Sequence, residues 1–196
     1  LCSLVCPHAV IRPFLLDEKE CLDAPDVVTK DLLPANIKNQ DLKYTIGVSL
    51  KDCTGCGLCE EICPGKKGAK ALIMKAKKEL EKDKKDEKAK YLFEEVKEKD
   101  VMPTNTVKGS QFKTPKFEFS GACAGCGETP YLKLLTQLFK DKMIIANATG
   151  CSSIYGASIP STPYTIPWAN SLFEDNAEFG FGMKIADNTM KDRIKT

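Results

Sequence analysis

Four cysteines, Cys53, Cys56, Cys59 and Cys63, stand at short, regular intervals and are followed directly by Pro64. The order C-x2-C-x2-C-x3-C-P is the ligand spacing of bacterial 4Fe–4S proteins. Gaps of two residues let a tight loop wrap three thiolates around one cube, and glycines in the gaps let backbone N–H groups approach the sulfides. The spacing therefore predicts an iron–sulfur cluster, with a zinc site or a redox dithiol as the alternatives.

A second, shorter group consists of Cys2 and Cys6, followed by Pro7, and it matches the last part of the same motif. In two-cluster ferredoxins the fourth cysteine of each motif ligates the other cluster. We therefore expect Cys6 to share a cluster with the first three cysteines of the longer motif. We expect this chain to be an internal fragment of a longer protein. Cys63 would then share the second cluster with Cys2 and with two cysteines that precede residue 1.

A third group contains Cys123 and Cys126, with the distant Cys151 as its third member. A fourth ligand would have to come from outside this segment. Zinc binds C-x2-C pairs equally well, and a redox dithiol also fits the spacing. The glycines around the pair favour a bulky, sulfide-bearing ligand over a compact ion.

Two further residues have side chains capable of chemistry but lie outside the three groups. Cys21 is interpreted as a buried apolar thiol, and His8 as a packed residue after a Cys-Pro turn. Neither is assigned a ligand role, and no catalytic residue is assigned.

The composition limits the class of protein. The 196 residues include ten cysteines and carry a formal net charge of +2, which predicts no nucleic-acid or membrane partner. The sequence has neither a long apolar run nor a secretory signal. Closely spaced cysteines then indicate metal ligands in a reducing compartment, so we expect the cytoplasm or a hydrogenosome-like anaerobic organelle.

The chain divides into three segments, 1–74, 75–116 and 117–196. The middle segment has mixed-sign charges and no cysteine, which predicts a solvated helix near 75–85 followed by a charged linker. The pattern of the last segment is helix, short apolar strand over 143–146, then a glycine turn, as in α/β domains. Ligands of such domains lie beyond the carboxyl ends of strands, where Cys151 falls.

The helix of the last segment is expected to begin at Thr129 as a cap, with Pro130 at its first position. Its apolar residues recur at helical spacing and predict the buried face. These residues are Tyr131, Leu134, Leu135 and Leu138, with Lys133, Gln137 and Lys140 on the opposite, polar face.

Three strings of the sequence resemble the pyruvate:ferredoxin (flavodoxin) oxidoreductase family. They are 121–131 (GACAGCGETPY), 145–154 (IANATGCSSI) and 168–175 (WANSLFED). The resemblance implies a ferredoxin-like α+β domain with two clusters, followed by the start of an α/β domain that binds thiamine diphosphate. It also implies that Cys123, Cys126 and Cys151 bind the cluster nearest the thiamine.

The implied activity is the oxidative decarboxylation of pyruvate to acetyl-CoA, with coenzyme A as the second substrate. Electrons would pass singly through three 4Fe–4S clusters to ferredoxin or flavodoxin, in a homodimer that also binds thiamine diphosphate and Mg²⁺. The fragment alone is not expected to be active. The alternatives are another 2-oxoacid or pyruvate:NADP oxidoreductase, or a non-catalytic ferredoxin-type electron carrier.

Overall fold

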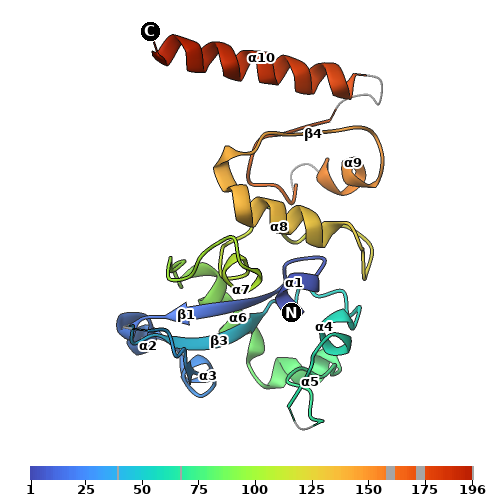
Figure 1. Ribbon diagram of the computed structural model, residues 1–196. Helices are drawn as coiled ribbons and strands as arrows, with labels where there is room; N and C mark the ends of the chain where they lie inside the picture. The colour runs from blue at the N-terminus through green and yellow to red at the C-terminus, as the bar shows by residue number, and fades with distance from the viewer. Residues whose placement is uncertain (39, 67, 158–161, 171–174, 196) are drawn as a thin grey trace.

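The computed structural model is an α+β protein with two parts, one built on a small antiparallel sheet and one on a helix and a parallel strand pair (Figure 1). The amino terminus lies near the junction of the two parts, and the carboxyl terminus lies at the far end of the last helix. The structure describes residues 1–38, 40–66, 68–157, 162–170 and 175–195.

The sheet of the first part has the strand order β1-β3-β2 and is antiparallel throughout. Strand β1 (Ile11–Leu16) pairs along its whole length with β3 (Lys43–Val48), and the short β2 (Leu33–Pro34) pairs with the other edge of β3. Pro13 has no N–H to donate, and it is tolerated because β1 is an edge strand.

Short helices lie around this sheet (Figure 1). Asp17 caps one of them in a capping box, because its side chain accepts from the N–H of Glu20 while the Glu20 carboxylate accepts from the N–H of Asp17. The helices are α1 (Cys2–Val5), α2 (Glu18–Asp23), α3 (Asp26–Thr29), α4 (Leu58–Glu61), α5 (Lys77–Lys82), α6 (Lys85–Glu94) and α7 (Val107–Ser110).

Helix α6 belongs to the core of the first part. Its Leu92 is fully buried, together with Leu16 of β1 and Val28 of α3. The charge pattern predicted a linker in this stretch, and a helix forms instead because a few apolar positions among many charges suffice to anchor it. Helix α5 matches the solvated helix expected near 75–85, since none of its residues is buried. The boundaries 1–74, 75–116 and 117–196 stay a prediction.

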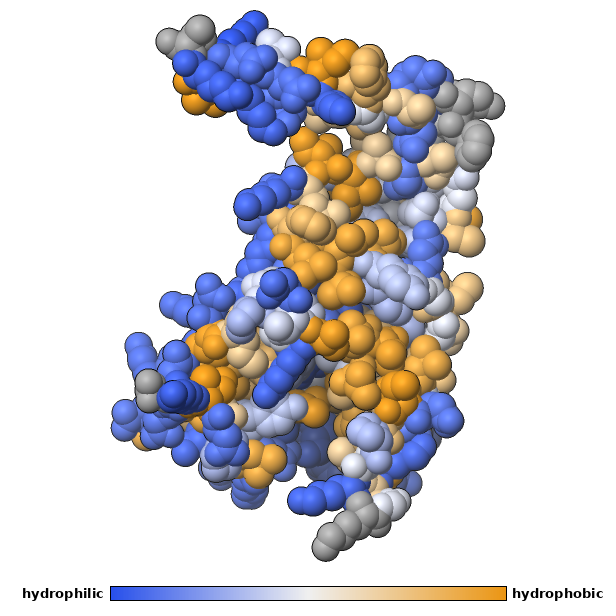
Figure 2. All heavy atoms as spheres, viewed as in Figure 1, coloured by the Kyte–Doolittle hydropathy of each residue, from blue (hydrophilic) through white to orange (hydrophobic). Residues whose placement is uncertain are grey.

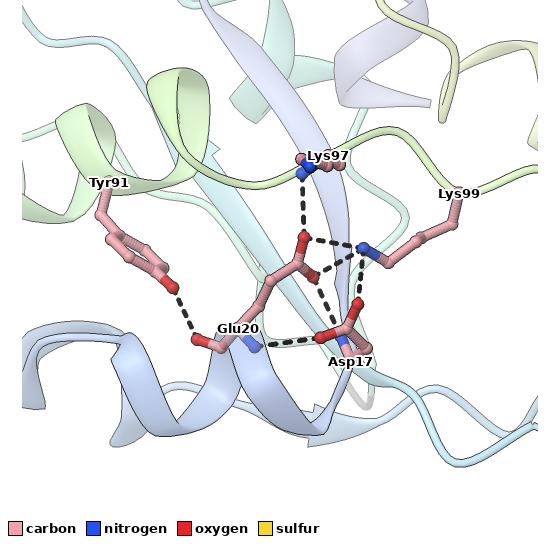
Figure 3. A network of polar contacts seen from close by, with 5 residues as sticks. All are labelled: Asp17, Glu20, Tyr91, Lys97 and Lys99. Carbon is pink, nitrogen blue, oxygen red and sulfur yellow. Dashed lines mark hydrogen bonds and ion pairs between the residues drawn. The ribbon is translucent and has the colours of Figure 1, made fainter.

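A polar network fastens the chain after α6 to the end of β1 (Figure 3). The Glu20 carboxylate accepts from Lys99 Nζ at 2.7 Å and from the backbone N–H of Lys97 at 3.0 Å. Tyr91 donates its hydroxyl to the backbone carbonyl of Glu20 at 2.6 Å, and Lys99 also pairs with Asp17. The stretch from α6 to Lys99 is therefore tied to the first part at several points.

The second part contains the helix and strand that the sequence predicts. Helix α8 begins at Thr129, but its N-cap is Glu128 and not the predicted Thr129, so Pro130 is its second residue. Strand β4 pairs with β5 in parallel; it begins two residues later than the predicted strand and is half-buried, whereas an apolar run of this kind was expected to be buried. Of the string 168–175, residues 171–174 lie outside the described ranges. The elements are α8 (Thr129–Phe139), η1 (Lys140–Lys142), β4 (Ile145–Asn147), α9 (Cys151–Gly156), β5 (Trp168–Asn170) and α10 (Asn176–Lys195).

The predicted orientation of α8 is wrong. Lys133 and Gln137, expected in solvent, are buried, whereas Tyr131 is 71% exposed and Leu135 and Leu138 are also exposed. Figure 2 shows apolar side chains gathered on the surface around α8. The polar face is buried because it has partners there, such as the carbonyl of Lys113, which accepts from Gln137 Nε2 at 2.8 Å.

Residues 117–120 join the two parts by running beside the segment after α1. Phe119 donates its N–H to the carbonyl of His8 at 2.9 Å, and His8 Nδ1 lies 3.0 Å from the carbonyl of Ser120. The Arg12 guanidinium forms an ion pair with Glu118. None of the helices formed by the described residues has the length and apolar character needed to cross a bilayer.

Candidate metal centre

Helices α1 and α4, which carry cysteines of the first two groups, lie against each other although more than fifty residues separate them (Figure 1). Cys6 ends α1 and is buried, and Cys59 lies half-buried on α4. Both thiols pack in one apolar cluster with Val10 and Ile11. The structure thus brings together Cys6 and Cys59, two of the partners that cross-ligation predicts.

The other two predicted partners lie on the loop that precedes α4. Gly55 and Gly57 adopt φ of +70° and +79°, a left-handed conformation that glycine adopts without strain. These two residues bend the loop that carries Cys53 and Cys56, both of which are exposed. Burial raises the pKa of the Cys59 thiol, and the charges of Cys6, Cys53 and Cys56 raise it further. Four sulfur atoms are therefore close enough to interact electrostatically.

Cys63 has a different environment from these four. The backbone N–H of Ala71 donates to its sulfur at 3.3 Å and is the largest cause of a lowered pKa, with further N–H groups from Gly65 and Leu72. Such N–H donors stabilise a thiolate. Cys2 begins α1 at the edge of the apolar cluster that contains Cys6 and Cys59.

The third group lies at the start of α8. The N–H of Cys126 closes a turn on the carbonyl of Cys123 at 3.1 Å, with Gly125 at φ +74° between them. A Cβ built on Gly125 would lie 3.8 Å from the Cβ of Cys56, so this loop lies beside the longer motif. The third member, Cys151, is exposed at the first position of α9, beyond the end of β4 as predicted.

Tyr155 links Cys126 to α9, the helix that begins at Cys151. Desolvation chiefly raises the pKa of Tyr155, and the charges of Glu128 and Cys126 add to this shift. Tyr155 follows Cys151 by four residues and so lies on the same side of α9. Across the described ranges, no three His, Cys, Asp or Glu side chains are arranged to hold a single metal ion. A cube of iron and sulfide holds its four thiolates farther apart than one ion does.

Lys133 is a residue near these thiols that sequence periodicity assigned to solvent. It is only 1% exposed, and its Nζ donates to the carbonyls of Ser3 and Leu4 in α1. Burial lowers the pKa of Lys133 to about 8, and the negative charge of Cys6 opposes this shift. The one signal in the sequence is its four-residue spacing from Gln137, which places both on one side of α8.

The two residues without an assigned role also have defined environments. His8 is buried between α1 and residues 117–120, as its interpretation as a packed residue predicts. Cys21 lies on α2, half-buried against the core that contains Leu16, and burial raises the pKa of its thiol.

No family model matches the chain. The chain is 53% identical over its whole length to a pyruvate:ferredoxin oxidoreductase of Moorella thermoacetica, covering 17% of that protein. It is 49% identical over 99% of its length to a pyruvate dehydrogenase [NADP(+)] of Cryptosporidium parvum, covering 10% of it. It is 48% identical over its whole length to a pyruvate-flavodoxin oxidoreductase of Enterobacter agglomerans, covering 17%.

Proposed function

We propose, from the membership of this chain in the pyruvate:ferredoxin (flavodoxin) oxidoreductase family, that it is the electron-relay segment of an enzyme that oxidises pyruvate. The whole protein would convert pyruvate and coenzyme A into acetyl-CoA by oxidative decarboxylation. The chain spans about a sixth or less of the length of these relatives, so the decarboxylation chemistry would depend on residues outside it.

The observation that carries this proposal is the meeting of Cys6 with the longer motif. Cys6 and Cys59 share one apolar cluster, and the charges of Cys6, Cys53 and Cys56 all act on the Cys59 thiol. We infer that these four thiolates bind one 4Fe–4S cluster. Cys63 and Cys2 would bind a second cluster with two cysteines from upstream, in a ferredoxin-like arrangement.

A third cluster would be bound by Cys123, Cys126 and Cys151, with its fourth ligand outside this segment. These cysteines lie before α8 and at the start of α9, around the parallel strand pair β4 and β5. That arrangement supports the start of a thiamine-diphosphate domain of the α/β class. Thiamine diphosphate and Mg²⁺ would bind with residues beyond this chain, and we assign no thiamine ligand here.

The structure also supports an order for the relay. The Gly125 backbone approaches Cys56 closely, so the cluster of the third group would lie next to that of Cys53, Cys56 and Cys59. The clusters would supply one-electron acceptors of low potential, as all-thiolate 4Fe–4S centres do. This chain positions them, provides N–H donors such as Ala71 to the sulfurs, and packs Val10 and Ile11 against the ligands.

The electron acceptor is proposed to be ferredoxin or flavodoxin, because clusters deliver electrons singly. Relatives whose names specify ferredoxin, flavodoxin and NADP⁺ are 53%, 48% and 49% identical, so identity alone does not select among them. We also propose that the whole protein is a homodimer and that it lies in the cytoplasm or in a hydrogenosome-like organelle.

The test is to purify the full-length protein without oxygen and to measure iron, acid-labile sulfide and pyruvate-dependent viologen reduction. We expect about twelve irons per chain, four for each of three clusters. Cys6→Ser and Cys59→Ser should each abolish the spectroscopic signature of the same cluster, whereas Cys21→Ser should retain all three.

Each part of the proposal has an outcome that would contradict it. Zinc without iron would exclude the clusters, and a full iron content without pyruvate-dependent reduction would exclude the substrate. If Cys6→Ser and Cys59→Ser affected different clusters, the proposed cross-ligation would be wrong. If the purified protein alone reduced NADP⁺, then NADP⁺ would be the electron acceptor in place of ferredoxin or flavodoxin.

A further inference from the structure

Lys133 is a buried cation at the boundary between the two parts of the molecule. It comes from α8, which directly follows the third cysteine group, and it reaches across to α1, which carries Cys2 and Cys6. No carboxylate of the described residues lies within ion-pair distance of its Nζ. A buried charge without a counter-charge is costly, so its neighbours must favour a cation in another way.

Two features around Lys133 do so. Its Nζ donates to the carbonyls of Ser3 and Leu4 in the last turn of α1, and the Ser3 carbonyl also accepts from the N–H of Cys6 at 3.4 Å. The second feature is the negative charge of Cys6, whose favourable effect on Lys133 is larger than the opposing effect of the nearby Arg12 cation, and Cys2 adds a smaller favourable effect. The ammonium group is therefore held against the backbone between these two cysteines.

We propose that Lys133 is a positioning residue for electron transfer, whose fixed positive charge favours the reduced state of the cluster that Cys6 binds. This inference depends on the proposed function, because it requires the cluster. A cluster with four thiolates carries net negative charge, which increases by one on reduction. A cation held nearby in a region of low dielectric stabilises the reduced state more than the oxidised one.

The direction of the effect follows from charge alone. Removing the cation should lower the reduction potential of the Cys6 cluster and leave the other clusters less affected. Because Lys133 is buried, solvent screens its charge weakly, and we expect the reduction equilibrium to shift by about tenfold or more. A tenfold change corresponds to about 59 mV for a one-electron couple.

The experiment compares four variants of the full-length holoprotein by potentiometric titration monitored with electron paramagnetic resonance. Lys133→Met removes the charge and the donors, Lys133→Gln removes the charge but keeps N–H donors on a shorter side chain, and Lys133→Arg keeps both. Lys113→Met is the control, because Lys113 is also buried, at 7% exposure against 1% for Lys133, but is paired with Asp100 at 2.7 Å and Glu98 at 3.2 Å.

The expected result is a lowered potential of one cluster in both neutral variants, with wild-type potentials in Lys133→Arg and Lys113→Met. Unchanged potentials in neutral variants that retain all their iron would overturn the proposal. Loss of iron from both neutral variants would also overturn it, in favour of a purely structural cap on α1. Wild-type protein without iron would instead refute the proposed function, so the two failures are distinguishable.

Discussion

Replacement of Leu92 by alanine tests whether the charged middle of the chain is part of the folded core. Leu92 of α6 is fully buried against Leu16 and Val28, which are also fully buried. A Cβ built on Gly47 of β3 would lie 3.0 Å from Leu92 Cδ1, so the helix approaches the strand backbone closely. Leu92 therefore fills a space whose walls come from three other elements.

The size of the effect follows from this packing. Leucine-to-alanine replacements in cores cost about 2–5 kcal/mol, and the cost is greatest where the surroundings cannot collapse. Paired strands form one wall of this site, so we expect about 3–4 kcal/mol of lost stability for Leu92→Ala. At about 1.4 kcal/mol for each factor of ten, the opening equilibrium of this region rises roughly several hundredfold.

Hydrogen exchange of the intact protein, measured by mass spectrometry, reports this opening for each peptide. We expect faster exchange in peptides that cover β1 and β3 as well as α6. Lys90→Ala, on the exposed face of the same helix, is the matched control and should leave those peptides protected. If Leu92→Ala accelerated exchange in α6 alone, the helix would be a separate linker and the argument would be refuted.

Two further predictions concern the caps and turns around this core. Asp17→Ala removes a helix cap and should cost about 1 kcal/mol at pH 7. The backbone N–H of Glu20 chiefly lowers the pKa of Asp17, so this stability is present above the carboxyl's ordinary pKa and lost as pH falls through the lowered one. The Asp17→Asn side chain carries no charge at any pH, so the unfolding temperatures of this variant and of the wild type should become equal in acid. A difference in unfolding temperature that stays constant with pH would contradict this. Gly109→Ala should cost about 1–3 kcal/mol, since the new Cβ would lie 2.0 Å from the Pro103 carbonyl oxygen, whereas Gly121→Ala, with open space around it, should unfold at the wild-type temperature.

The sequence predicts which cysteines of the first two groups come together better than it predicts the packing around them. Ligand spacing is a local property, so the longer motif indicates a cluster without any knowledge of the fold. The meeting of Cys6 with Cys59 was predicted for the same reason, because cross-ligation follows from two copies of one motif. The start of α8 was predicted to within one residue, since Thr129 begins the helix but Glu128 occupies the N-cap position that was assigned to Thr129.

Burial is set by whatever packs against an element, and the two failed expectations share this cause. Charge pattern placed residues 85–94 in a linker, yet they form α6, whose Leu92 is buried. Apolar periodicity identified the residues that share a face of α8 correctly but chose the wrong face as buried, because the partners of Lys133 are backbone carbonyls of α1, which no side-chain pattern encodes. A lysine placed by such carbonyls and by nearby thiolates is stable only once both cysteine-bearing parts are folded together. The position of Lys133 therefore depends on the docking of the two parts, and its charge would be available to the proposed cluster only in the assembled protein.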